Sequence, residues 1–223
     1  MNPRELVKKY GGRFSSALGI RLSSSDAGEI FKWFIASMLF GARISGNIAI
    51  RTYKEFESRG IASPEEVVKT GWDGLVAILD EGGYARYDFK TVTKLLAVCK
   101  MLMEKYKGDL NILHSKSLDN EDLENRLKAL GKGIGDVTVN IFLRELRGIW
   151  QKAMPLPSDI VMTAAKKEGF IPEELTDRQK ALKMLLSSWT GGKEGENNLK
   201  SLPDFESALV KSGLATRRKS SKK

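Results

Sequence analysis

Apolar residues recur along much of the chain at intervals of three and four positions, which is the spacing of one face of an α-helix. A pass along the sequence finds no segment with the strict apolar–polar alternation of a half-buried strand. The pattern predicts helices over residues 28–40, 47–59, 64–71, 72–80, 89–106, 119–130, 136–150, 158–169, 176–189 and 203–211. We therefore predict an all-α fold.

Several of these helices have recognisable starts. Ser63, Pro64 and Glu66 form a capping-box pattern with proline in the first turn. Thr176 and Gln179 form a second capping-box pattern. The segment 28–40 is apolar nearly all round, which predicts a helix buried at the centre of a core.

Composition divides the chain into three parts. Residues 1–27 are polar and rich in Gly and Ser, so we expect an N-terminal arm with one short helix at most. Residues 28–214 carry the helical pattern and form the predicted domain. Residues 215–223 are basic and are expected to be a structureless tail that contacts phosphate or aids solubility.

The balance of charge favours a polyanionic partner. The 223 residues carry a net charge of +9, and cations seated on phosphates release condensed counterions. A basic surface with no such partner is the alternative. The apolar run at 30–40 contains Lys32 and is shorter than the roughly 20 residues that span a bilayer. With no signal-peptide pattern at the start, we expect a cytoplasmic protein that does not enter a membrane.

The cysteine, the histidine and the large aromatic residues limit which kinds of site the chain can form. Cys99 is the one cysteine, which excludes an intrachain disulfide, a zinc knuckle and a cysteine-held iron–sulfur cluster; we expect it to be buried. His114 stands alone in a polar stretch and is expected in a surface loop. Five aromatic residues at helical spacings are expected mainly in the core: Trp33, Phe34, Trp72, Phe142 and Trp150.

The segment from Leu130 to Thr138 is the most informative part of the sequence. Gly131, Gly133 and Gly135 allow a tight reversal between two helices, with Ile134 inserted between them. The amides that follow lie at a helix N-terminus, where the helix dipole favours an anion. The segment therefore predicts a phosphate-binding turn, with an ordinary glycine-closed turn as the alternative.

From about residue 30 to 169 the chain resembles the helix–hairpin–helix base-excision DNA glycosylases, the superfamily of endonuclease III and the alkylpurine glycosylases. The matching pieces occur in the family's order. They are Met38–Ser45 followed by Ala49, then Gly83–Tyr84 with Lys90–Leu96, then Leu130–Asn140, and finally Pro157-Ser158-Asp159.

The resemblance implies a two-lobed helical bundle with a helix–hairpin–helix and a cleft between lobes at about 28–118 and 119–214. It implies that the chain binds double-stranded DNA with a lesion or mismatch. The implied DNA contacts are Lys132, Gly133, Ile134, Gly135, Val137, Thr138, Arg43 and Ser45. The residues implied to line a base pocket or act as a wedge are Arg43, Tyr84, Arg86 and Tyr87. Packing roles for the two tyrosines and Arg86, and a surface salt bridge for Arg43, are the alternatives.

Asp159 is the implied catalytic residue. Cleavage of an N-glycosidic bond develops positive charge on the sugar, which a nearby carboxylate stabilises. Asp159 follows a Pro-Leu-Pro segment and lies in the first turn of a predicted helix that Ser158 can cap. The alternative is an ordinary first-turn aspartate.

Two departures from the family's pattern refine the expectation. Members with lyase activity carry a lysine two residues after the last glycine of the hairpin, where this chain has Val137. The resemblance thus implies base removal without strand cleavage, unless Lys132 or Lys152 replaces that lysine. Asp136 would repel a phosphate unless it turns inward as a helix cap.

The expected function is that of a monofunctional DNA glycosylase, acting as a monomer in the cytoplasm, or on the nucleoid of a prokaryote. No cofactor is expected, although a structural monovalent or divalent cation at the hairpin stays open. Two rivals stand beside it. One is a non-catalytic DNA-binding protein that recognises duplex or damaged DNA, and the other is a helical protein-interaction module. The sequence does not indicate which base is removed.

Overall fold

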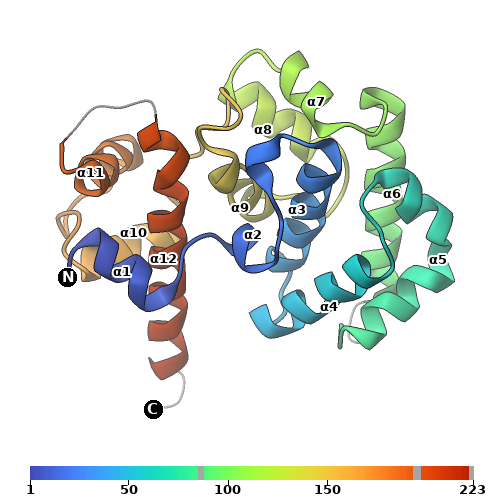
Figure 1. The fold of residues 1–223 in the computed structure, drawn as a ribbon, viewed down its shortest axis with the longest axis horizontal. Helices are drawn as coiled ribbons and strands as arrows, with labels where there is room; N and C mark the ends of the chain where they lie inside the picture. The colour runs from blue at the N-terminus through green and yellow to red at the C-terminus, as the bar shows by residue number, and fades with distance from the viewer. Residues whose placement is uncertain (85–87, 193–196, 221–223) are drawn as a thin grey trace. The chain divides into compact units, whose positions relative to one another are not determined.

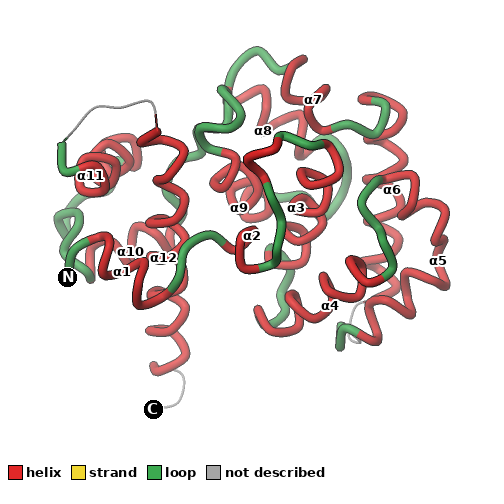
Figure 2. The backbone as a smooth tube through the Cα atoms, in the orientation of Figure 1, coloured by secondary structure: helices red, strands yellow, loops and turns green. Residues whose placement is uncertain are grey.

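The computed structural model describes residues 1–84, 88–192 and 197–220, and the regular elements in these ranges are helices (Figures 1 and 2). Within the same ranges the one pairing of strand type is an isolated bridge between Arg147 and Trp150. The prediction of an all-α fold is confirmed.

The chain forms two compact units. Unit 1 consists of residues 1–19 and 143–223, and its helices are α1 (Pro3–Tyr10), α2 (Phe14–Ala17), α10 (Asp159–Lys167), α11 (Arg178–Thr190) and α12 (Asn197–Ser220). Unit 2 consists of residues 20–142, with the 3₁₀ turn η1 (Leu22–Ser24), α3 (Ala27–Phe40), α4 (Gly46–Ser58), α5 (Pro64–Glu81), α6 (Asp88–Tyr106), α7 (Leu110–Lys116) and α8 (Asn120–Lys128). Helix α9 (Asp136–Leu146) begins in unit 2 and ends in unit 1.

These units differ from the predicted arrangement. The division falls after Phe142, within α9, whereas the sequence suggested a boundary near residue 118. Residues 1–19 are part of a core and do not form a separate arm. Helix α1 packs on α11 and α12, and Leu6 is fully buried there (Figure 1). A capping box between Asn2 and Glu5 starts this helix.

Unit 1 is built around α12. Helices α1, α10 and α11 pack against it, and the Trp189 and Phe205 rings stack in the core with centroids 5.7 Å apart. The completely buried Arg147 pairs with Glu206 at 3.1 Å and donates to the Pro155 carbonyl at 2.8 Å. A lone buried charge would be costly, so this pair compensates both groups.

A second buried carboxylate fixes the N-terminal segment within unit 1. Glu145 accepts hydrogen bonds from the backbone amides of Phe14 and Ser15, at 2.8 and 2.9 Å. These two amides open the short helix α2, where free N–H groups lack a helical partner. The buried carboxylate therefore holds the start of α2 against the end of α9.

Unit 2 is centred on α3, the helix that the sequence predicted to be buried. Trp33 and Phe34 are almost fully buried. The Trp33 indole donates to the Phe142 carbonyl at 3.1 Å, and the Phe34 and Phe142 rings meet edge to face at 5.3 Å. These contacts join α3 to α9, which lies more than a hundred residues further along the chain.

Among the predicted helix boundaries, those at Ser63 and Gly71 hold, and those of α11 and α12 need correction. Ser63 caps α5 as expected, and the helical geometry of α5 is interrupted at Gly71, with φ of 71°. Asp177, and not Thr176, caps α11 by accepting from two amides. Helix α12 extends well beyond the predicted 203–211 and reaches into the tail that was expected to be structureless.

Three single-residue expectations have different outcomes. Cys99 is fully buried, and burial, with a smaller contribution from Glu65, raises the pKa of its thiol to about 12, so it stays protonated at neutral pH. His114 lies in helix α7 and not in a loop. Trp72 is not a core residue: it is 42% exposed and stacks on Phe89 with ring centroids 5.0 Å apart.

Gly82 is required where α5 ends, because the helix α4 passes close to it. A Cβ added at Gly82 would lie 2.5 Å from the Cα of Thr52.

We expect Gly82→Ala to lower the free energy of unfolding of the protein by about 1–3 kcal/mol, since the close contact is with backbone. Urea denaturation followed by circular dichroism measures this change. Gly46→Ala, in open space at the start of α4, is the control and should change stability by no more than about 1 kcal/mol. Equal effects of the two substitutions would contradict the packing argument.

Candidate nucleic-acid interface

The turn between α8 and α9 folds around one buried side chain. Ile134 is buried, and its amide donates to the Gly131 carbonyl at 3.3 Å. Gly133 has φ of 110°, a conformation that side chains other than glycine rarely adopt. The Gly135 carbonyl then accepts the first helical bond of α9, from Val139 at 3.0 Å. The turn therefore leads directly into the N-terminus of α9.

The outer face of this turn is open to solvent. Lys132, Gly133, Gly135 and Val137 are exposed, whereas Thr138 is buried. The first amides of a helix have no carbonyl one turn earlier to bind, so those of α9 are available to an external acceptor. A shallow hollow of about 610 Å³ lies over this face and is lined by the turn itself and by Gly41. This is the geometry of an anion site at a helix N-terminus.

Asp136 does not turn inward as the sequence analysis required for phosphate binding. Its side chain is 90% exposed and forms an ion pair with Lys128 at 2.5 Å. The hydrogen bond to Asp136 raises the pKa of Lys128, so the lysine stays charged. The carboxylate is thus balanced by a cation on α8. Sequence reasoning missed Lys128, although its position in the last turn before the glycines is visible in the sequence.

Close packing explains two of the glycines around the turn. A Cβ on Gly133 would lie 2.9 Å from the Cδ of Lys94 on α6. A Cβ on Gly41, at the end of α3, would lie 3.2 Å from the Cα of Thr138. The end of α3, the start of α9 and one face of α6 therefore meet at the turn.

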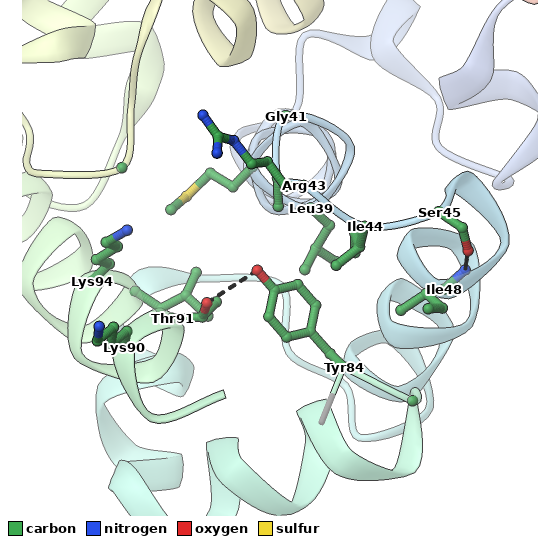
Figure 3. Close-up of a pocket in the computed structure, with 15 residues that line it drawn as sticks. Leu39, Gly41, Arg43, Ile44, Ser45, Ile48, Tyr84, Lys90, Thr91 and Lys94 are labelled. Atoms are coloured by element: carbon green, nitrogen blue, oxygen red, sulfur yellow. Dashed lines mark hydrogen bonds between the residues drawn. The ribbon is translucent and has the colours of Figure 1, made fainter. Parts of the chain in front are cut away.

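A pocket of about 760 Å³ lies beside the turn, within unit 2 (Figure 3). It is lined by residues from the α3–α4 loop, the end of α5, the first turns of α6, and the turn residue Gly133. Four residues that the resemblance singled out come together here: Arg43, Ser45, Tyr84 and Gly133. Gly41 and Gly133 line both this pocket and the hollow over the turn. Arg86 and Tyr87, predicted for the same role, lie outside the described residues.

Hydrogen bonds hold two of the lining side chains. The Ser45 hydroxyl caps α4 by accepting from the Ile48 amide at 3.3 Å. The Thr91 hydroxyl donates to the Tyr84 hydroxyl at 3.1 Å, which fixes the ring of Tyr84 as a wall of the pocket (Figure 3). The Ser45 hydroxyl oxygen is therefore used as a helix cap, whereas the Tyr84 hydroxyl can still donate its hydrogen to a ligand.

The electrostatic character of the pocket is positive. Its cations are Arg43, Lys90 and Lys94, and no Asp or Glu of the described chain lines it. None of the three forms an ion pair with another described residue, so the salt bridge considered for Arg43 is not observed. Sequence reasoning did not assign Lys90 or Lys94 a role. Their spacing of four within a helix was the available signal, because it places both on one face.

Asp159 belongs to unit 1 and is the first residue of α10, as predicted. Its carboxylate is 85% exposed and pairs with Arg178, the first residue of α11. Arg178 also donates to the Pro157 carbonyl at 2.6 Å, so one guanidinium holds both the approach to α10 and its first side chain. Ser158 occupies the cap position but makes no capping hydrogen bond. Arg178 could not be found from local sequence, since it begins a different helix.

The sequence matches no family model and no curated protein. Across the described ranges, no cluster of three or more His, Cys, Asp or Glu side chains is arranged to hold a metal ion. None of the helices in those ranges is both long and apolar enough to cross a bilayer.

The Arg178–Asp159 pair is exposed and should contribute little to stability. We expect a double-mutant cycle with Arg178→Ala and Asp159→Asn to give a coupling energy below about 1 kcal/mol, because solvent screens the pair. Thermal or urea unfolding of the four proteins measures it. Lys183→Ala, on the same helix, serves as a control in place of Arg178 and should show no coupling to Asp159. A coupling above about 2 kcal/mol would show that the pair is a structural clamp.

Proposed function

We propose that the protein is a helix–hairpin–helix DNA glycosylase that flips a damaged or mispaired base and hydrolyses its N-glycosidic bond without cutting the strand. One observation carries the proposal. An exposed glycine turn at a helix N-terminus adjoins a pocket whose three cations form no ion pair with any described residue. Gly41 and Gly133 line both the turn's hollow and this pocket. The absence of a family match leaves this proposal resting on the residues themselves.

The turn supplies a sequence-independent contact with duplex DNA. Amides at the start of α9, together with the helix dipole, suit one phosphate of the backbone. Lys132 adds an exposed cation at the same place, and Lys128 offsets the charge of Asp136. Contacts of this kind position a protein on DNA without reading bases.

Asp159 is the proposed catalytic group. As the exposed carboxylate at the start of α10, it is suited to stabilise positive charge on the sugar and to orient the attacking water. In the free protein the carboxylate is paired with Arg178, and this exposed pair must loosen for the carboxylate to act on the sugar.

The proposed reaction is hydrolysis and not β-elimination. Val137 stands where lyase members of the family place the lysine that attacks the sugar, and its side chain is 63% exposed. An isopropyl group cannot form a Schiff base, so water is the nucleophile. The product is an abasic site in an intact strand.

A panel of duplexes, each with one lesion or mismatch, tests the proposal. We expect at least one duplex to lose its base, with strand breaks appearing only after alkali and with no adduct trapped by borohydride. Asp159→Asn should bind that duplex within about twofold of the wild type but release the base at least about 100-fold more slowly. Glu173→Gln, another exposed carboxylate of unit 1, is the matched control and should keep full activity.

The same panel separates the rival functions. The ion pair between the exposed Asp159 and Arg178 in the free protein favours the non-catalytic DNA-binding alternative. DNA binding without base release from any duplex would support that alternative over the glycosylase. A trapped borohydride adduct would show lyase chemistry and contradict the argument from Val137.

Salt dependence tests the contact at the turn. We expect the affinity for duplex DNA to fall steeply as salt rises, because several phosphates release counterions. Lys132→Gln should reduce the slope of log K against log salt by about 1, since one phosphate contact is lost. Fluorescence anisotropy at four salt concentrations measures both slopes, with Lys69→Gln, an exposed lysine remote in sequence from the turn, as the control. A flat response in the wild type would exclude the DNA proposal.

A further inference from the structure

The pocket of unit 2 concentrates positive charge that nothing in the described chain neutralises. Arg43 lines it from the α3–α4 loop, and Lys90 and Lys94 line it from α6 (Figure 3). Like charges that converge on one hollow repel one another, and a bound anion removes that repulsion. The occupant of the pocket should therefore carry negative charge.

The two lysines are arranged as a pair. Lys90 and Lys94 are one helical turn apart, so their side chains leave the same face of α6 (Figure 3). Like charges at this spacing weaken a helix, so their placement is not explained by the stability of α6. The stem of Lys94 also packs on Gly133 of the turn, which restricts the directions its ammonium can take. Two donors from one rigid element suit a phosphate group.

Much of the remaining lining is apolar and suits a ring. Leu39, Ile44 and Ile48 line the pocket together with the side chain of Tyr84 (Figure 3). The volume of about 760 Å³ lies within the range of pockets that enclose small organic ligands. A free inorganic phosphate would leave this apolar wall unused, whereas a nucleobase attached to a phosphate would contact both parts.

We propose that this pocket binds a single nucleotide together with its phosphate, with Lys90 and Lys94 as the phosphate ligands and Arg43 and Tyr84 as donors to the base. The inference rests on the proposed function, in which that nucleotide is an unpaired unit of the DNA strand gripped at the α8–α9 turn. The inference gives Lys90 and Lys94 a role as phosphate ligands. It also predicts that residues of unit 2 recognise an unpaired nucleotide in addition to the duplex backbone.

Titration of the full-length protein with small probes tests the pocket directly. We expect deoxynucleoside 5′-monophosphates to bind at least tenfold more tightly than the matching deoxynucleosides or inorganic phosphate, by calorimetry at low salt. The Lys90→Gln/Lys94→Gln protein should lose at least tenfold in monophosphate affinity. The matched control Lys100→Gln/Lys105→Gln removes the same charge from exposed positions of α6 outside the pocket and should bind as the wild type does.

Three results would overturn the inference. These are equal binding of nucleoside and monophosphate, unchanged binding in Lys90→Gln/Lys94→Gln, or an equal loss in the control pair, which would indicate general charge attraction. Because all four lysines are exposed, the variants should unfold at the wild-type temperature, which thermal denaturation checks. Arg43→Gln offers a second variant that leaves α6 intact and should weaken monophosphate binding as well.

Duplex DNA with and without one unpaired nucleotide distinguishes this inference from the proposed function. We expect the wild type to prefer the duplex with the unpaired nucleotide, and Lys90→Gln/Lys94→Gln to lose the preference while still binding the perfect duplex through the turn. If the wild type binds monophosphate but no duplex, the DNA proposal fails and the nucleotide pocket stands. If it binds duplex without preference and without monophosphate binding, the pocket inference fails and the DNA proposal stands.

Discussion

The close approach of α3 to the start of α9 positions two parts of the candidate interface in unit 2, the α3–α4 loop and the α8–α9 turn. Gly41 lies against Thr138, and the Trp33 indole donates to the Phe142 carbonyl. These two contacts fix α3 against α9 at two points. Because α3 is buried along most of its length, it can serve as a rigid reference for the loop that follows it. That loop carries Arg43 into the pocket, and the same contact orients the turn before α9.

The two units treat charge in different ways. In unit 1 the buried charges of Arg147, Glu206 and Glu145 are satisfied by ion pairing or by backbone groups. Arg144 is also buried there; its Nε has no hydrogen-bond partner among the described residues, and the nearby carboxylates of Glu145 and Glu206 favour its charge. In the pocket of unit 2 the cations are exposed and unpaired within the described chain, so water solvates them in the free protein. Compensated charges hold a fold together, whereas uncompensated ones at a hollow are available to a ligand.

The exposed carboxylates at the two helix starts of interest are also balanced. Asp136 faces Lys128, and Asp159 faces Arg178. Each pair keeps a negative charge near a helix N-terminus, where the dipole favours it, while reducing its repulsion toward an approaching polyanion. Exposed pairs of this kind are weak, so an incoming phosphate can compete with the carboxylate for the cation at small cost.

The sequence by itself determined the helical class, the buried helix 28–40, the break at Gly71 and the glycine turn with Ile134 inside, because periodicity, caps and glycine conformations are local properties. It also brought Arg43, Ser45 and Tyr84 into one hypothesis. Only the tertiary structure decided that residues 1–19 complete the core of unit 1, that Trp72 lies on the surface, and that the Lys94 side chain packs against Gly133. These features depend on contacts between segments far apart in the chain, and no local pattern encodes which segments meet.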